Sequence, residues 1–198
     1  MTKNVIITTP VFRYIEQALH FSFLMEILPV ERKSSMHKIV ELMREGSFAG
    51  NRDDSSGINF DGLDPMEVRA QCAMVRGAVS HHLPGPEADV VHARYGQFAC
   101  KKNGIVGVRD YCLPSLSEPT RNNVDAASMM TISVFGVRKD RECLSARKIA
   151  AYCGLSSASV GRDIQKIHEL GLTLFKRGVG RIEPMFKNQG LVGEGLMR

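Results

Sequence analysis

The sequence predicts a mainly α-helical protein, in which a helical N-terminal region is followed by a C-terminal helix-turn-helix with a short β-hairpin, or wing. Three observations predict this fold. Apolar residues recur at helical spacing through much of residues 1–137, and capping and stop signals bound several of these stretches. Residues 144–172 have the pattern of two helices joined by a tight turn, and a basic, Gly-rich segment follows them.

Two helices are predicted near the N-terminus. The first covers residues 12–28 and ends before Pro29, and the second covers residues 34–46, from a capping serine to Gly46. Residues 47–62 are rich in Gly, Asn, Asp and Ser and break every helical period. They are therefore predicted to form a loop.

A third helix is predicted to begin at Asp64. Pro65 suits the first turn, and Glu67 stands three residues after the cap, as in a capping box. A fourth helical stretch follows the Pro-Gly-Pro turn and runs to Gly104. We expect the third and fourth helices to form a helical hairpin.

The chain is expected to divide at residues 114–122, which are rich in Pro, Ser and Asn and indicate a linker. Residues 1–113 would form the helical region, and residues 123–198 would form the winged helix-turn-helix domain. Residues 124–139 are compatible with a helix or with a helix that turns into a strand, because β-branched residues are frequent there.

The helix-turn-helix pattern rests on which positions are small and which are apolar. Ile149, Cys153 and Leu155 supply apolar positions around the turn, and Ala150 stands where the second helix must approach closely. Gly154 stands at the turn itself, where a positive φ is usual. The second helix has an inward stripe at spacings of four, three and three residues, formed by Val160, Ile164, Ile167 and Leu170.

The opposite side of the second helix carries residue types that suit DNA reading. An arginine can hydrogen-bond a guanine edge at two points and a glutamine an adenine edge, and small residues let backbone amides reach a phosphate. The predicted DNA-binding residues of this helix are Ser157, Ala158, Gly161, Arg162, Gln165 and Lys166.

The segment after the second helix has the outline of a two-stranded hairpin with a basic tip. An apolar run leads to Lys-Arg-Gly-Val-Gly, and a further short run ends before Pro184. This predicts a wing in which Lys176, Arg177 and Arg181 contact DNA.

The distribution of charge along the chain also favours DNA binding by the C-terminal part. The net charge is +5, but residues 121–198 hold 13 Lys and Arg and 7 Asp and Glu, whereas residues 1–120 hold 13 and 14. The basic excess therefore belongs to the part of the chain with the DNA-binding pattern, which favours a polyanionic partner.

Residues 158–172, ASVGRDIQKIHELGL, resemble the recognition helix of winged-helix bacterial regulators of the deoxyribose-operon repressor class. The similarity covers about a fifth of the chain once the wing is included. It implies DNA binding by this helix and the wing. No sugar-binding domain is indicated upstream, so effector binding is not implied.

Residues 82–97, HLPGPEADVVHARYGQ, with the helix end Ala93–Gly96, resemble the phage late-gene antiterminators of the Q type. This resemblance implies a transcription antitermination factor that binds double-stranded DNA and bacterial RNA polymerase. The helical region would then supply the polymerase-binding surface. We expect such a protein in the cytoplasm of the bacterial host cell.

Two other functions are compatible with the sequence. A phage or plasmid replication initiator also uses a winged helix, but it would bind repeated origin sites and recruit a helicase. A helical interaction adaptor would bind proteins and no nucleic acid. Salt-dependent DNA affinity separates the adaptor from the two DNA-binding proteins.

An enzyme, a metal site and a membrane protein are not expected. His81, His82, Glu87 and His92 do not have the spacing of a zinc helix, and the five cysteines include no close pair. Asp53 and Asp54 lie in a polar loop without a phosphate-binding motif. No signal-peptide pattern or membrane span is visible, and no cofactor is implied.

Overall fold

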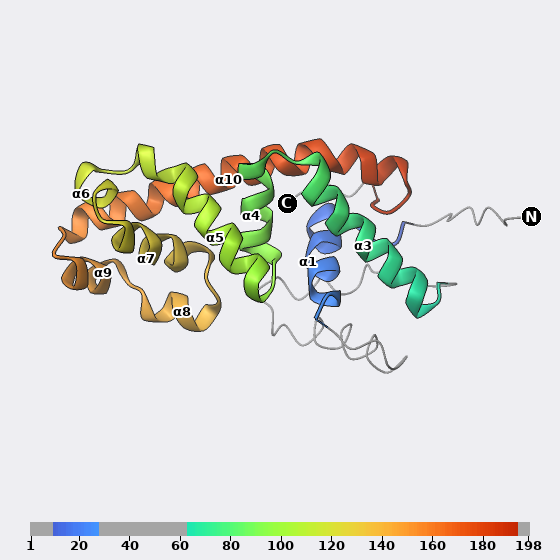
Figure 1. Ribbon diagram of the computed structural model, residues 1–198. Helices are drawn as coiled ribbons and strands as arrows, with labels where there is room; N and C mark the ends of the chain where they lie inside the picture. Colours follow the sequence, from blue (N-terminus) through green and yellow to red (C-terminus); the bar gives the residue numbers. More distant parts are fainter. Residues whose placement is uncertain (1–9, 28–62, 194–198) are drawn as a thin grey trace, which may run out of the picture. The chain divides into compact units, whose positions relative to one another are not determined.

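The computed structural model describes residues 10–27 and 63–193 (Figure 1). The regular elements in these ranges are helices, which confirms the mainly α fold. The only extended pairing in them is an isolated parallel bridge between Phe12 and Val192. The helices are α1 Ile15–Met25, α3 Pro65–His82, α4 Gly85–Tyr95, α5 Phe98–Cys112, α6 Glu118–Arg121, α7 Val124–Phe135, α8 Arg138–Cys143, α9 Ala146–Cys153 and α10 Ser157–Asn188, with a 3-10 turn, η1, at Leu113–Ser115.

The chain divides into two compact units. Residues 1–82 and 181–198 belong to unit 1, and residues 83–180 belong to unit 2. The boundaries expected from the sequence, at residues 113 and 123, therefore differ from those in the structure. Each unit is described separately below. The second predicted helix (34–46) and the predicted loop (47–62) lie outside the described residues.

Unit 1 has an aromatic core around α1. Phe12 and Phe21 are fully buried, and their ring centroids are 5.8 Å apart. The Phe12 amide donates to the Leu191 carbonyl oxygen at 2.9 Å, and the Gly193 amide donates to the Phe12 carbonyl oxygen at 2.9 Å. These bonds fix the described C-terminal end of the chain beside the start of α1.

The capping box predicted for α3 is confirmed. The Asp64 carboxylate accepts from the Glu67 amide at 3.2 Å, and the Glu67 carboxylate accepts from the Asp64 amide at 2.8 Å. Farther along α3, the Arg76 guanidinium donates to the Ser22 carbonyl oxygen at 2.6 Å, which ties α3 to α1. Burial raises the pKa of the nearby Cys72 thiol to about 11, so this thiol is protonated at neutral pH.

Unit 2 contains a close pair of helices, α4 and α5. The stretch predicted as one helix breaks at Gly96 into α4 and α5, which form a helical hairpin. The third predicted helix, α3, belongs to unit 1. A Cβ added at Gly104 would lie 2.5 Å from the Ala93 backbone nitrogen, and one at Gly107 would overlap the Asp89 carboxylate. Glycine at position 104 lets the two helix backbones approach closely, and glycine at position 107 leaves room for the Asp89 side chain.

The predicted linker is wrong. Residues 114–122 form part of η1 and the short helix α6, and they lie inside unit 2. Leu116 and Thr120 of this segment are buried. The ambiguous stretch after it is a helix, α7, which Asn123 caps by accepting from the Ala126 amide at 3.0 Å.

The predicted β-hairpin wing is also wrong. The segment from Gly171 to Pro184 is helical and lies within α10. Its apolar residues follow a helical period, with Leu174, Phe175 and Val179 buried. Gly178 is a packing position, because a Cβ there would lie 3.4 Å from the Glu87 Cβ.

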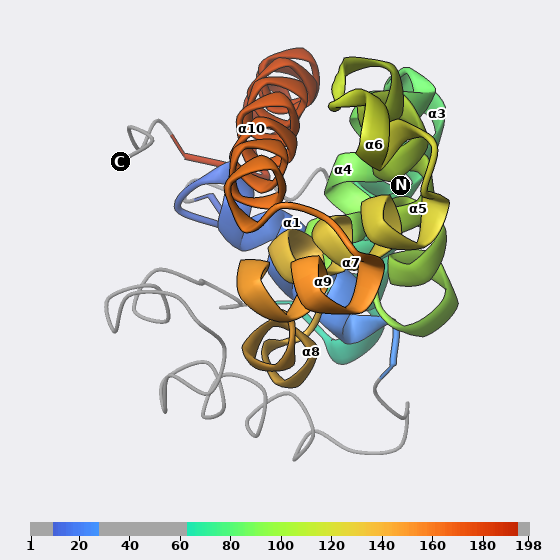
Figure 2. The ribbon, with the colours of Figure 1, turned by 90° about the vertical axis from the view of Figure 1, so that its left-hand side faces the viewer.

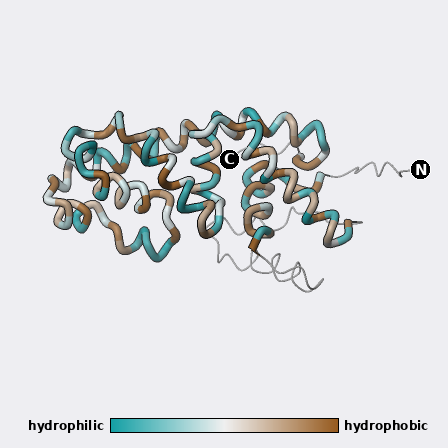
Figure 3. Tube along the Cα trace, viewed as in Figure 1, coloured by the Kyte–Doolittle hydropathy of each residue, from teal (hydrophilic) through white to brown (hydrophobic). Residues whose placement is uncertain are grey.

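Hydrophobic and hydrophilic segments alternate along the described helices (Figure 3). This alternation is typical of helices that bury one side only. Within residues 10–27 and 63–193, no helix combines the length and the apolar character needed to cross a bilayer.

We predict that Gly104→Ala lowers the free energy of unfolding by about 2 kcal/mol, because overpacking of this kind costs on the order of 1–3 kcal/mol. The added Cβ would meet backbone atoms of α4 at 2.5 Å and 2.6 Å, which no rotamer change can relieve. Urea denaturation followed by circular dichroism measures the change.

Gly180→Ala is the matched control. Gly180 is an exposed position of α10, and a Cβ there meets nothing within 4 Å. Alanine should stabilise this helix by up to about 1 kcal/mol. Equal effects of the two substitutions would show that α4 and α5 do not pack through Gly104.

Candidate nucleic-acid interface

The helix-turn-helix predicted from the sequence is formed by α9, a short turn and the start of α10. The Ser145 hydroxyl caps α9 by accepting from the Lys148 amide at 3.4 Å. Gly154 ends this helix with φ 67°, in the left-handed region that favours glycine. The Leu155 amide then donates to the Ala150 carbonyl oxygen at 2.9 Å, which closes the turn.

The start of α10 is fixed by a second cap and by its apolar stripe. The Ser156 hydroxyl accepts from the Ser159 amide at 3.4 Å. Val160 and Ile167 are fully buried, and Ile164 and Leu170 are half-buried, so the predicted inward stripe is confirmed. Figures 1 and 2 show α7, α9 and the first turns of α10 side by side, as in a three-helix unit.

The predicted DNA-binding residues of α10 are brought together on its first turns. Gly161 is half-buried, and the other five are exposed: Ser157, Ala158, Arg162, Gln165 and Lys166. The Arg162 Nε donates to the Ala158 carbonyl oxygen at 3.4 Å, and the Gln165 amide donates to the Glu169 carboxylate at 2.9 Å. Both side chains therefore lie along the helix surface.

The first helix of the pair adds exposed residues that the sequence reasoning missed. Arg147, Lys148 and Tyr152 of α9 are exposed, and Tyr152 retains 78% of its accessible surface. The signal was present in the sequence, since residues 138–166 hold seven Lys and Arg and three Asp and Glu. A basic helix beside the first turns of α10 provides contacts for phosphates.

Two of the three residues assigned to the wing, Lys176 and Arg177, are not brought to this surface. Lys176 and Arg177 lie on α10 roughly 28 Å along the helix axis from Ser157, at 1.5 Å per residue. The Arg177 Nε lies 3.4 Å from the Glu87 Oε1, and the Glu87 side chain is 2% exposed, so Arg177 pairs with a buried carboxylate. Arg181 belongs to unit 1.

Asp163, one of the three acidic residues in the range 138–166, is buried on α10. It is 5% exposed, and its carboxylate accepts from the Ser117 amide at 3.1 Å, the Ser117 hydroxyl at 2.6 Å and the Thr120 hydroxyl at 2.6 Å. Ser117 is the N-cap residue of α6. The carboxylate thus satisfies polar groups at the start of α6 and fixes this helix to α10.

The ARYG-like helix end also packs against α10. The Arg94 guanidinium carbon lies 4.5 Å from the centroid of the Phe175 ring, and the rings of Tyr95 and Phe175 are 6.0 Å apart. In this chain the motif therefore has a packing role within unit 2.

The other residues considered as metal ligands do not assemble. Among the described residues, no three His, Cys, Asp or Glu side chains are grouped to hold a metal ion. Cys143 is exposed, whereas burial raises the pKa of the Cys112 thiol to about 11. Asp53 and Asp54 lie outside the described residues.

The chain matches no known family model, and a search of curated proteins finds no significant similarity.

We predict that Asp163→Ala lowers the free energy of unfolding by about 3 kcal/mol, because it leaves buried donors without an acceptor, at a cost on the order of 1–3 kcal/mol each. Urea denaturation measures the change. Glu169→Ala is the control, since its exposed carboxylate accepts from the exposed Gln165 side chain, and exposed substitutions usually stay within about 0.5 kcal/mol. A loss at Asp163 no larger than at Glu169 would contradict the assigned network.

Proposed function

We propose that this chain is a sequence-specific DNA-binding transcription regulator that reads the major groove with the first turns of α10. The observation that carries the proposal is the capped helix-turn-helix, whose second helix directs Arg162, Gln165 and Lys166 outward while Val160 and Ile167 are buried. This arrangement supports reading of base edges by one face of a helix.

Phosphate contacts would come from α9 and not from a wing. The Arg147 and Lys148 side chains are exposed on the first turn of α9, and Ser156 and Ser157, which follow the Gly154 turn, are exposed as well. Cationic and hydroxyl groups of this kind position a protein on the DNA backbone without reading sequence.

The finer proposal concerns the process that is regulated. The resemblance of residues 82–97 to phage late-gene antiterminators of the Q type supports a factor that acts on bacterial RNA polymerase in the host cytoplasm. This part of the proposal depends on the short resemblance at residues 82–97 and not on the helix-turn-helix, so it is tested separately from DNA binding. Reconstituted transcription through a terminator, with and without the protein, tests it directly.

We predict that Arg162→Ala relaxes sequence preference, with a loss on the order of 1–3 kcal/mol at one base pair if the guanidinium reads a guanine. The target is first obtained by selecting bound duplexes from a random library with the parent protein. Affinities of parent and variant are then measured by fluorescence anisotropy on the selected duplex and on its single-base variants.

Lys176→Ala is the control for this measurement. Lys176 is exposed on the same helix, about 21 Å farther along the axis than Arg162. Its substitution should therefore leave DNA affinity unchanged. If Arg162→Ala binds every duplex as the parent does while circular dichroism shows it to be folded, α10 does not read the bases.

We further predict that Gly161→Ala separates stability from DNA binding. A Cβ at Gly161 meets nothing within 4 Å, so alanine should stabilise the helix by up to about 1 kcal/mol. The same methyl group would occupy space where a closely docked DNA backbone lies, so affinity for all duplexes should fall. Gly180→Ala offers equal open space away from this surface and should raise stability alone. Unchanged affinity in Gly161→Ala would place the DNA elsewhere.

A further inference from the structure

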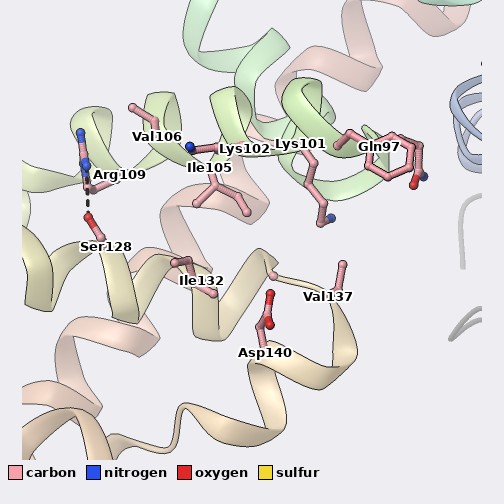
Figure 4. A pocket seen from close by; sticks show the side chains of 12 residues that line it. Gln97, Lys101, Lys102, Ile105, Val106, Arg109, Ser128, Ile132, Val137 and Asp140 are labelled. Atoms are coloured by element: carbon pink, nitrogen blue, oxygen red, sulfur yellow. Dashed lines mark hydrogen bonds between the residues drawn. The ribbon is translucent and has the colours of Figure 1, made fainter. Parts of the chain in front are cut away.

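Unit 2 contains a groove between α5 on one side and α7 with the start of α8 on the other (Figure 4). Its volume is about 620 Å³. Ile105 from α5 and Ile132 from α7 contribute apolar lining, and Lys102, Ser128 and Asp140 contribute polar groups. The Arg109 guanidinium donates to the Ser128 hydroxyl at 3.1 Å, which bridges the two walls. None of the residues assigned to DNA binding lines this groove.

Apolar side chains continue from the groove onto its open rim. Phe98 retains 81% of its accessible surface, Val137 retains 52% and Val106 retains 38%. Phe98 also has φ 43°, a left-handed conformation that bulky residues seldom adopt. An exposed aromatic side chain held in an unfavourable backbone conformation points to a function outside the core.

Three of the four charged residues that line the groove are cationic. Lys101, Lys102 and Arg109 line it, and Asp140 is the one acidic lining residue. The Lys102 side chain is exposed, so its charge faces solvent at the rim. The Lys101 ammonium donates to the Ala93 carbonyl oxygen at 2.6 Å, and its pKa is lowered by burial and by the Arg141 charge. The Arg109 guanidinium is paired with Asp110, whose Oδ1 lies 2.6 Å from the Arg109 Nη2. Lys102 is therefore the cation that faces solvent beside the apolar floor.

We propose that this groove binds an acidic amphipathic helix of a partner protein. Its apolar side chains would enter between Ile105 and Ile132, and its carboxylates would lie beside Lys102. A groove between two helices, with apolar residues on the floor and on the rim, is suited to an amphipathic helix. The cationic rim favours an acidic sequence over a basic one.

The exposed rim favours a helix over a small molecule. A small ligand buries most of its own surface inside its cavity, and it would leave Phe98 and Val137 in water. A helix lying along the groove covers both. This inference does not rest on DNA binding, because the groove and the first turns of α10 share no residue.

The test uses the full-length protein and three synthetic helical peptides labelled with a fluorophore. The first has leucines spaced by three and four residues with glutamates between them. The second has lysines in place of the glutamates, and the third has serines in place of the leucines. Anisotropy titrations should give saturable binding of the acidic leucine peptide alone.

Two valines provide a matched pair of variants. Val137 lines the groove and is 52% exposed, whereas Val124 lies at the start of α7 outside the lining and is 50% exposed. Val137→Glu should weaken the acidic peptide at least tenfold, and Val124→Glu should leave its affinity unchanged. Lys102→Glu should weaken it as well. Phe98→Gly should lower affinity while the melting temperature is unchanged or raised, because glycine accepts the positive φ.

Several results would overturn the proposal. These are no saturable binding of the acidic leucine peptide, equal binding of the lysine peptide, and equal loss in the two valine variants. A concentration-dependent dimer that disappears in Val137→Glu would show that a second copy of the chain occupies the groove instead. DNA affinity is measured in parallel on duplexes bound by the parent. It should be unaltered in Val137→Glu, so failure of the groove and failure of DNA binding are distinguished.

Discussion

The buried carboxylate of Asp163 is the constraint on which the arrangement of unit 2 depends. An acidic side chain that is 5% exposed is costly unless hydrogen-bond donors satisfy it, and here Ser117 and Thr120 supply three. The segment before α7 must therefore fold onto α10. Arg162 is the neighbour of Asp163 on the helix, and neighbouring side chains of a helix point in different directions. The inward position of Asp163 therefore leaves Arg162 exposed. One side chain thus couples the course of residues 114–122 to the face that α10 presents.

The parts of the fold that local signals specify were predicted well. The capping box at Asp64 and Glu67 and the left-handed turn at Gly154 involve bonds between residues close in sequence, so their patterns are visible without the fold. The outward residues of α10 followed from its inward stripe for the same reason. The basic face of α9 was present in the sequence as Arg147 and Lys148 but was not recognised.

The two wrong predictions, the wing and the linker, fall on segments rich in glycine, proline and polar residues. Gly178 and Pro184 resembled turn residues, but α10 continues through both. Gly178 lies against Glu87, a contact between residues far apart in sequence. The polar stretch at residues 114–122 resembled a linker because the acceptor for its hydroxyl groups, Asp163, lies more than forty positions away. The groove beside α5 was not predicted, since it depends on how α5 and α7 pack.

Because residues 171–184 are helical and form no wing, the proposed DNA contacts have to come from other residues. Where a wing would contact DNA, the middle of α10 is instead anchored to α4, through the Arg177 and Glu87 pair and through stacking of Arg94 on Phe175. Arg177 is thus paired with a carboxylate within unit 2, and Lys176 is exposed but lies about 21 Å along the helix axis from Arg162. On the proposed function, DNA contacts would come from α9 and the first turns of α10. A partner held in the groove beside α5 would add binding energy through its own contacts. The two surfaces together are what a regulator needs when it joins a DNA site to another protein.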